Sequence, residues 1–135
     1  MNGTIIDANV MIDVLSNDPT WAAWSSDEIL SALTRGPVII NPIVYAEIAA
    51  GMESPEELEH HLGDPDIERR PLPWDAAFLA GKAFAAYRRR GGRLRSPMPD
   101  FYIGAHAAVE RLAVVTRDPR RFTRYFPSVT VLSPG

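Results

Sequence analysis

The sequence predicts a single α/β domain in which a five-stranded, mostly parallel sheet is flanked by helices in three α/β/α layers. Short apolar runs without alternation, such as residues 4–6 and 38–40, are typical of strands buried on both faces. These runs alternate with helix-compatible stretches, and parallel strands need such crossovers. With 135 residues the chain fits one ordinary domain, which we expect to span residues 1–135.

Composition excludes several classes of function. The chain has no cysteine, which rules out disulfides, thiolate catalysis and cysteine-based metal sites. No apolar stretch approaches the length of a bilayer span, and the N-terminus lacks the basic and apolar regions of a secretory signal. We therefore expect a cytoplasmic protein that does not enter a membrane.

The net charge of -3 hides an uneven distribution. Residues 1–87 carry 14 acidic side chains against four basic ones, whereas residues 88–124 carry ten arginines against three acids. The second region can bind a polyanion despite the acidic total. Arginine suits bidentate contacts to phosphate, although a GC-rich genome would also favour arginine over lysine.

The first third of the chain alternates two strands with helices. The strand at residues 4–6 stops at Asp7, and a short helix over residues 8–15 ends at Asn17-Asp18-Pro19. Thr20 can cap a second helix, roughly residues 21–34, which Gly36-Pro37 closes before the strand at residues 38–40. The apolar face expected for this second helix consists of Trp21, Trp24, Ile29, Leu30 and Leu33.

Glu47 lies on the next expected helix, roughly residues 42–50. Asn41 and Pro42 suit the N-cap and the first position of this helix. At helical spacing Glu47 lies beside apolar residues, where an unpaired ionised carboxylate would be costly, so we expect it to have a partner. A capping box at Ser54-Pro55-Glu56-Glu57 then opens a short polar helix.

The second half of the chain repeats the alternation of strands and helices. Asp100 falls in the first turn of a helix whose small residues Gly104, Ala107 and Ala108 would let it approach the sheet closely. Asp118 follows the strand after that helix. The expected elements are a strand at 67–72, helices at 75–90 and 100–111, a strand at 113–116, a helix at 119–125 and a strand at 129–132, with a basic loop at 91–97.

Four acidic residues are expected to meet at one edge of the sheet. Asp7 and Asp118 directly follow strands, and Glu47 and Asp100 lie on helices beside strand ends. Four carboxylates without cysteine or a histidine pair suit Mg²⁺ rather than zinc. Each acid also has an ordinary interpretation: Asp7 as a cap, Glu47 in an ion pair, Asp100 at the positive end of its helix and Asp118 in a turn.

The ordered motifs resemble those of PIN-domain ribonucleases. They are Asp7-Ala8-Asn9-Val10-Met11-Ile12-Asp13, Glu47 after Asn41-Pro42, residues 99–107 from Pro99-Asp100 onward, and Val115-Thr116-Arg117-Asp118 with Phe122. The length of the chain resembles that of the VapC-type toxins of bacterial toxin-antitoxin modules. By this resemblance Asp7, Glu47, Asp100 and Asp118 match the acidic quartet that holds metal, and Asn9 and Thr116 match supporting polar positions.

The resemblance implies an activity and partners. It implies a Mg²⁺- or Mn²⁺-dependent endoribonuclease, usually a homodimer, that is inhibited by a co-expressed antitoxin protein. Arg93, Arg95 and Arg117 are then candidates for contacts with the RNA backbone, although arginines at solvated helix ends would look the same. We expect His106 to be a helix-surface or packed histidine rather than a phosphate contact, and Asp13 to cap or pair rather than bind metal.

Two other functions remain compatible with the residues. A metal-dependent DNA nuclease or a phosphatase would use similar acids, but an aspartate-nucleophile phosphotransferase commonly has a second aspartate where this chain has Asn9. A catalytically silent PIN-like module could bind RNA or protein without cutting. The complete acidic quartet argues against the silent module, because a module that does not cut RNA has no need for four carboxylates that repel one another.

Overall fold

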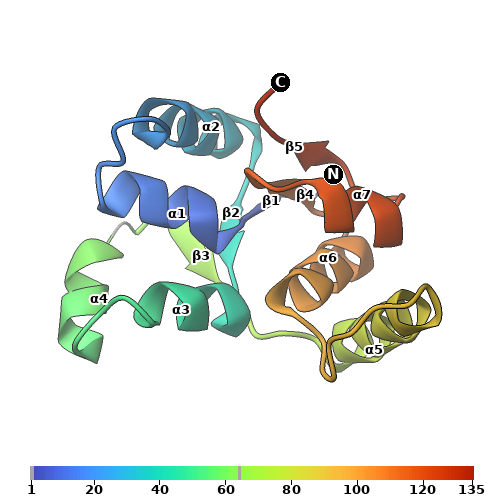
Figure 1. The fold of residues 1–135 in the computed structure, drawn as a ribbon. Coiled ribbons are helices and arrows are strands. Elements are labelled where there is room, and N and C mark those ends of the chain that lie inside the picture. Colours follow the sequence, from blue (N-terminus) through green and yellow to red (C-terminus); the bar gives the residue numbers. More distant parts are fainter. Residues whose placement is uncertain (1, 64) are drawn as a thin grey trace.

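Five parallel strands form the sheet at the centre of the fold (Figure 1). The strands are β1 (Thr4–Ile6), β2 (Val38–Ile40), β3 (Ile67–Arg69), β4 (Ala113–Val115) and β5 (Val131–Leu132). The computed structural model describes residues 2–63 and 65–135, and in them the strand order is β3-β2-β1-β4-β5. β1 lies in the middle, paired with β2 on one side and β4 on the other. The predicted five-stranded α/β fold is confirmed.

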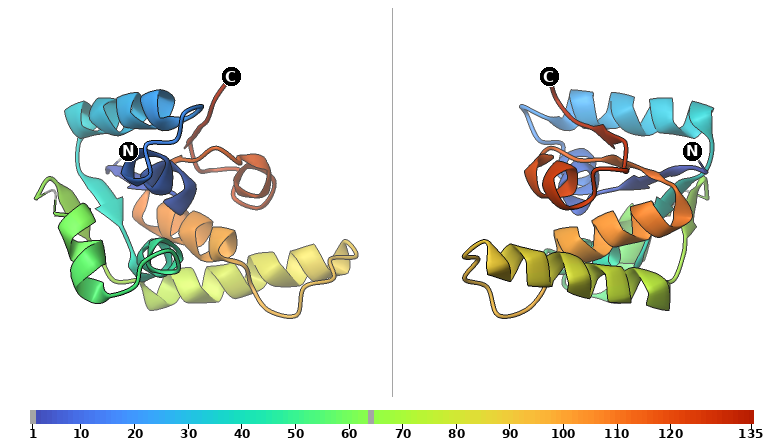
Figure 2. Two further views of the ribbon diagram at one scale, coloured as in Figure 1. Left: turned by 60° about the vertical axis from the view of Figure 1, so that its left-hand side comes forward. Right: turned by 90° about the vertical axis from the view of Figure 1, so that its right-hand side faces the viewer.

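Helices cover both faces of the sheet. In the described residues these are α1 (Ala8–Leu15), α2 (Ala22–Arg35), α3 (Pro42–Ala49), α4 (Pro55–His61), α5 (Trp74–Arg89), α6 (Pro99–Glu110) and α7 (Arg120–Tyr125). Figure 2 shows α2 on one face of the sheet and α6 on the other, with α5 packed on the outer side of α6. Of the helices described, none combines the length and the apolar character needed to cross a membrane.

The main core forms because the central strands are apolar on both faces. Ile5, Ile39 and Val114, from β1, β2 and β4, have no exposed surface. Burial of each such side chain contributes about 1.5 to 3 kcal/mol to stability. A second, smaller cluster around Phe101 joins α5, α6 and the residues after α7. The two clusters together fix α6, which carries Asp100, between the sheet and α5.

Two of the predicted helix caps are confirmed. Oδ1 of Asn41 accepts the backbone N–H of Val44 (3.0 Å) at the start of α3, the helix that carries Glu47. Oγ of Ser54 accepts the N–H of Glu57 (3.1 Å) at the start of α4. Each bond satisfies a backbone donor that the first turn of a helix leaves free.

The start and the apolar face of α2 differ from the prediction. Thr20 does not cap this helix; instead Oδ1 of Asp18 accepts the N–H groups of Thr20 and Trp21, both at 2.8 Å. Leu30 is 58% exposed, whereas Ala32 is fully buried. Trp24, Ile29 and Leu33 pack against the main core, as predicted, so Leu30 is the member of the predicted face that is turned away from it.

The small residues of α6 make contacts of two kinds. A Cβ at Gly104 would lie 2.3 Å from Cδ2 of Phe126, so this glycine admits the phenyl ring and does not face the sheet as predicted. Ala107 is buried in the main core with the strands, as predicted. The third strand is also shorter than the predicted 67–72, because Pro71 has no N–H with which to extend the ladder beyond Arg70.

Candidate active site

Asp7 is both a helix cap and a buried acid at the end of β1. Its Oδ1 accepts the N–H of Ala8 (2.8 Å), and its Oδ2 accepts the hydroxyl of Thr116 (2.7 Å). Only 4% of the residue is exposed. Burial, more than any other effect, raises the pKa of Asp7 to about 6; the charges of Asp100 and Asp118 act in the same direction, and the two hydrogen bonds oppose them.

Glu47 reaches the same region from α3, and one of its carboxylate oxygens has no partner. Oε1 is buried and forms no hydrogen bond with any residue that the structure describes. Burial raises the pKa of Glu47 to about 7, with further contributions from the charges of Asp7 and Asp100. The expected partner is therefore not supplied by the described part of the chain. A buried carboxylate in this position takes up a proton or a cation.

Asp100 and Asp118 lie on the more open side of the group. Burial raises the pKa of Asp100, and Arg121, whose Nη1 is 3.6 Å from Oδ2 of Asp100, acts against this shift. The Asp118 side chain is 54% exposed and lies 3.4 Å from Nε of Arg120. The backbone N–H of Asp118 donates to Oγ1 of Thr116 (3.1 Å).

The four acids affect one another, as expected for side chains at one edge of a sheet. The charges of Asp7 and Asp100 raise the pKa of Glu47, and the charge of Asp118 raises those of Asp7 and Asp100. Within residues 2–63 and 65–135, however, no three acidic or histidine side chains are placed ready to hold one metal ion. Mutual repulsion keeps bare carboxylates apart. Their oxygens, with the unpartnered Oε1 of Glu47, suit a hard divalent cation.

Thr116 and Asn9 connect the start of α1 with the loop after β4. Oγ1 of Thr116 donates to Asp7 and lies 3.4 Å from Nδ2 of Asn9. Oδ1 of Asn9 accepts the N–H of Arg117 (3.3 Å). The two predicted supporting residues thus join α1 to the loop that carries Asp118, and Thr116 orients a carboxylate oxygen of Asp7 directly.

A comparison with protein families decides the assignment of the chain. The family model described as the PIN domain matches residues 4–126, from the first residue of β1 to the residue after α7. The chain belongs to the PIN domain family. The resemblance in the ordered motifs is confirmed, and all four acids lie within the matched range.

Several solved structures share the fold of this PIN domain. VapBC2 from Rickettsia felis, bound to a promoter DNA fragment, is 18% identical, with a TM-score of 0.76 and 98% coverage of each chain. DNA-bound VapBC from Salmonella typhimurium is 25% identical, with a TM-score of 0.72 and 98% coverage of each chain. VapBC-5 from Mycobacterium tuberculosis is 23% identical, with a TM-score of 0.62 and coverage of 99% and 100%. A comparison with curated proteins gives no match.

Arg117, a predicted RNA contact, binds other side chains of the same domain. Its guanidinium donates to both carboxylate oxygens of Asp13 (2.7 and 3.0 Å) and lies 5.2 Å from the ring centroid of Trp21. Asp13 is 2% exposed and also accepts the hydroxyl of Ser25 (2.8 Å). This network fastens the loop that carries Asp118 onto α1 and α2. Asp13 pairs, as expected, and a contact of Arg117 with RNA stays a prediction.

Of the two states expected for His106, on the helix surface or packed, the structure shows the packed one. It has no exposed surface, and its Nδ1 lies 3.0 Å from Nδ2 of Asn41, while its Nε2 lies 3.1 Å from Oε1 of Glu110. Burial lowers the pKa of His106, with Glu110 acting against the shift. Because Asn41 caps α3, His106 helps to hold the helix that carries Glu47.

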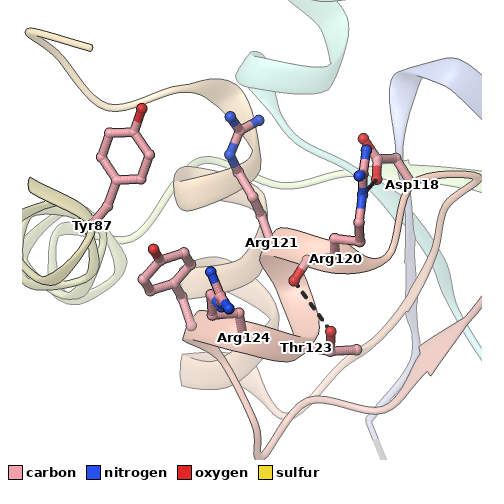
Figure 3. Close-up of a pocket in the computed structure, with 7 residues that line it drawn as sticks. Tyr87, Asp118, Arg120, Arg121, Thr123 and Arg124 are labelled. Atoms are coloured by element: carbon pink, nitrogen blue, oxygen red, sulfur yellow. Dashed lines mark hydrogen bonds and ion pairs between the residues drawn. The ribbon is translucent and has the colours of Figure 1, made fainter. Parts of the chain in front are cut away.

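A pocket of about 700 Å³ lies beside Asp118, between α5 and α7 (Figure 3). Its walls include Tyr87, Asp118, Arg120, Arg121, Arg124 and Tyr125, and we call it the α5–α7 pocket. The predicted RNA contacts Arg93 and Arg95 are exposed in the loop after α5 and do not line it. The arginines at positions 120, 121 and 124 indicate a basic surface from the sequence alone. No sequence pattern shows that Tyr87 lies beside them.

Proposed function

We propose that this PIN domain is a metal-dependent endoribonuclease that hydrolyses phosphodiester bonds of RNA. The observation that carries the proposal is the buried, unpartnered oxygen of Glu47, on which the charges of Asp7 and Asp100 both act. Such a group is costly in the absence of a cation, and a PIN domain that only bound RNA would gain nothing from it. Oxygen donors of this kind suit Mg²⁺ or Mn²⁺.

Asp7, Glu47, Asp100 and Asp118 would hold the ion. When bound, it supplies stabilisation of negative charge on the phosphate and a lower pKa for a nearby water. Thr116 keeps one oxygen of Asp7 in a fixed orientation. A water attacks phosphorus in line, the bond to the 3′ oxygen breaks, and that oxygen takes up a proton. By resemblance to the family, the products carry 5′ phosphate and 3′ hydroxyl ends.

We further propose that the protein is the toxin of a toxin-antitoxin module in the cytoplasm. The similarity to DNA-bound VapBC, at 25% identity over 98% of both chains, supports an antitoxin protein as partner. A homodimer is the proposed assembly, and the exposure of Trp74 (91%) and Phe78 (70%) on α5 supports a surface that a partner covers. Light scattering of the purified chain tests the dimer, and co-purification with the product of the neighbouring reading frame tests the antitoxin.

The decisive experiment is cleavage of total RNA by the purified protein with Mg²⁺ or Mn²⁺ and with EDTA. Asp7→Asn and Asp100→Asn are expected to lose at least about 100-fold of the activity, because each removes a charged ligand. Asp27→Asn, an exposed acid on α2, is the matched control and is expected to cleave like the wild type.

Three outcomes would contradict the proposal. Equal cleavage by the Asp7 and Asp100 variants would exclude the acidic site and indicate a contaminating nuclease. Binding of RNA without cleavage under any metal condition would favour the silent module. Faster cleavage of DNA than of RNA would favour the metal-dependent DNA nuclease.

A further inference from the structure

A buried hydrogen bond joins the two helices that carry Glu47 and Asp100. Nδ2 of Asn41, the cap of α3, lies 3.0 Å from Nδ1 of His106 on α6. His106 has no exposed surface and Asn41 is 2% exposed, so water cannot replace either partner. Breaking the bond would leave two buried polar groups unsatisfied, which is costly. The bond therefore holds the start of α3 against α6.

The surroundings of the bond determine which atom donates. Oδ1 of Asn41 accepts the N–H of Val44 (3.0 Å), so the amide NH₂ group faces His106. Nδ1 of His106 is therefore the acceptor, and the ring proton is on Nε2. Nε2 lies 3.1 Å from Oε1 of Glu110, too poorly aligned for a full hydrogen bond but close enough for the carboxylate to favour a proton there. Burial lowers the pKa of His106, which favours the neutral ring that the bond requires.

Glu110 is held in turn at the edge of the sheet. Nη1 of Arg70 lies 3.0 Å from Oε1 of Glu110, and the backbone N–H of Arg70 donates to the carbonyl of Ile40 (3.0 Å) at the end of β2. We call the set Arg70, Glu110, His106 and Asn41 the α3–α6 link. Its outer ion pair is partly exposed, whereas the bond between His106 and Asn41 is buried. We therefore expect the inner bond to have the larger effect.

The α3–α6 link and the acids lie at different points along the same two helices. Glu47 lies six residues after Asn41, and Asp100 lies six residues before His106. At about 1.5 Å of rise per residue, each acid is about 9 Å along its helix from the bond. The charge of Asp100 raises the pKa of Glu47, so the two carboxylates lie within electrostatic reach of each other. A slide of α3 along α6 at the bond would therefore move Glu47 relative to Asp100.

Apolar packing alone does not fix the position of α3 on α6. The two helices contact each other, and both bury side chains in the main core, among them Val44 and Ile103. Hydrophobic burial has no preferred direction, so it tolerates small slides. A buried hydrogen bond has a defined length and angle and tolerates less. Because Mg²⁺ demands near-ideal ligand geometry, a small slide is enough to weaken its binding.

We propose that His106 is a positioning residue: through its bond to Asn41 it sets the place of α3 on α6 and thereby the position of the Glu47 carboxylate relative to Asp100. This inference rests on the proposed metal-dependent function and adds to it a residue outside the acidic group. The competing explanation is that the bond only satisfies two buried polar groups and affects stability alone. The experiment separates these two roles.

The test is Mn²⁺ binding by the full chain without RNA, measured from the EPR signal of free Mn²⁺. His106→Asn places an amide oxygen near the position of Nδ1 and can still accept from Asn41. His106→Gln is closer to histidine in size but reaches toward Glu110 and loses that acceptor. His106→Gln is expected to weaken Mn²⁺ binding about fivefold or more, and His106→Asn to stay within about twofold of the wild type. A role in stability alone predicts no such difference.

Two further measurements do not depend on His106→Gln. Asn41→Ser keeps a capping hydroxyl for α3 but is too short to reach His106. It is expected to weaken Mn²⁺ binding as much as His106→Gln does, and the double variant no further, because both remove the same bond. In the wild type, ¹⁵N NMR of the imidazole of His106 is expected to show the proton on Nε2.

Leu112→Ala is the matched control for stability. Leu112 is 2% exposed and lies between α6 and β4, at the opposite end of the sheet from the acids. The cavity that this variant leaves is expected to lower the melting temperature at least as much as His106→Gln does. Its affinity for Mn²⁺ is expected to equal that of the wild type. Circular dichroism checks that each variant is folded at the temperature of the measurement.

Several results would overturn the inference. These are unchanged Mn²⁺ affinity in His106→Gln and Asn41→Ser, a loss in His106→Asn or Leu112→Ala as large as in His106→Gln, and a ring proton on Nδ1. Cleavage of RNA separates this inference from the proposed function. Cleavage with Mn²⁺ binding that is independent of His106 contradicts the positioning role alone, whereas His106-dependent Mn²⁺ binding without cleavage contradicts the nuclease alone. No Mn²⁺ binding by the wild type contradicts both.

Discussion

The hydroxyl of Thr116 donates a 2.7 Å hydrogen bond to Oδ2 of Asp7 across 109 residues of sequence. Thr116→Val removes this donor from a fully buried position while keeping the branched shape. Because the bond lowers the pKa of Asp7, the variant is expected to raise that pKa and to weaken metal binding about tenfold or more. A Mn²⁺ titration of RNA cleavage measures the effect. Thr116→Ser keeps the hydroxyl, so equal losses in the two variants would contradict the role of the bond.

Asp7 is expected to destabilise the metal-free protein at neutral and alkaline pH. Its pKa is about 6 in the fold and 3.8 ordinarily, so the unfolded chain releases the proton first as the pH rises. Stability is therefore lost between about pH 4 and pH 6 and stays low above that range. At about pH 8 in EDTA, the free energy of unfolding of Asp7→Asn is expected to exceed that of the wild type by roughly 2 to 3 kcal/mol, so the variant unfolds at a higher urea concentration. At about pH 3 no gain in stability is expected.

Asp27→Asn is the control for this measurement of stability against pH. Asp27→Asn is exposed and is expected to change stability by less than about 0.5 kcal/mol at either pH. Saturating Mg²⁺ or Mn²⁺ is expected to stabilise the wild type more than Asp7→Asn, since a ligand of the folded state adds to its stability. An Asp7→Asn difference that is the same at both pH values would exclude a raised pKa in the fold.

The pairing of Arg117 with Asp13 is expected to contribute to stability. Arg117→Ala leaves the buried Asp13 with only the hydroxyl of Ser25, and the free energy of unfolding is expected to fall by about 2 kcal/mol or more. Arg120→Ala is the matched control, because its side chain is 89% exposed and its ion pair with Asp118 is worth less than about 1 kcal/mol. Urea unfolding of both variants compares them, and equal losses would contradict a structural role for the buried pair.

Gly104 and Gly81 form a matched pair of helix glycines. A Cβ at Gly104 meets the ring of Phe126 at 2.3 Å, whereas a Cβ at Gly81 meets nothing within 4 Å. Gly104→Ala is expected to destabilise by about 1 to 3 kcal/mol through overpacking. Gly81→Ala is expected to stabilise by about 0.5 to 1 kcal/mol, because alanine favours helix. Thermal unfolding measures both, and a stabilising Gly104→Ala would show that Phe126 can move aside freely.

Much of the fold could be predicted because its signals are local. The runs at residues 4–6 and 38–40 are apolar throughout, which indicates strands covered on both faces. Asn41 and Ser54 are caps whose partners lie three residues away, within the reach of sequence patterns. The convergence of Asp7 and Asp118 can be predicted because each directly follows a strand, and the carboxyl ends of parallel strands lie at the same edge of the sheet.

The features that escaped prediction depend on distant pairs. Asp13 and Arg117 are 104 residues apart, and their contact depends on how the loop after β4 lies against α1. Tyr87 reaches the α5–α7 pocket because α5 packs on α6, an arrangement that no local pattern encodes. Helical spacing places Leu30 on the apolar face of α2 but does not show where the neighbouring elements end, and Leu30 is 58% exposed.

The place of β1 in the middle of the sheet determines when the site can exist during synthesis. β1 is made first, but its neighbour β4 begins at Ala113, and the last carboxylate, Asp118, is made later still. A nascent chain that has not passed this point has one unpaired side of β1 and an incomplete set of acids. In the proposed endoribonuclease, the set of four acids is therefore complete only after β4 and the loop that carries Asp118 have been synthesised.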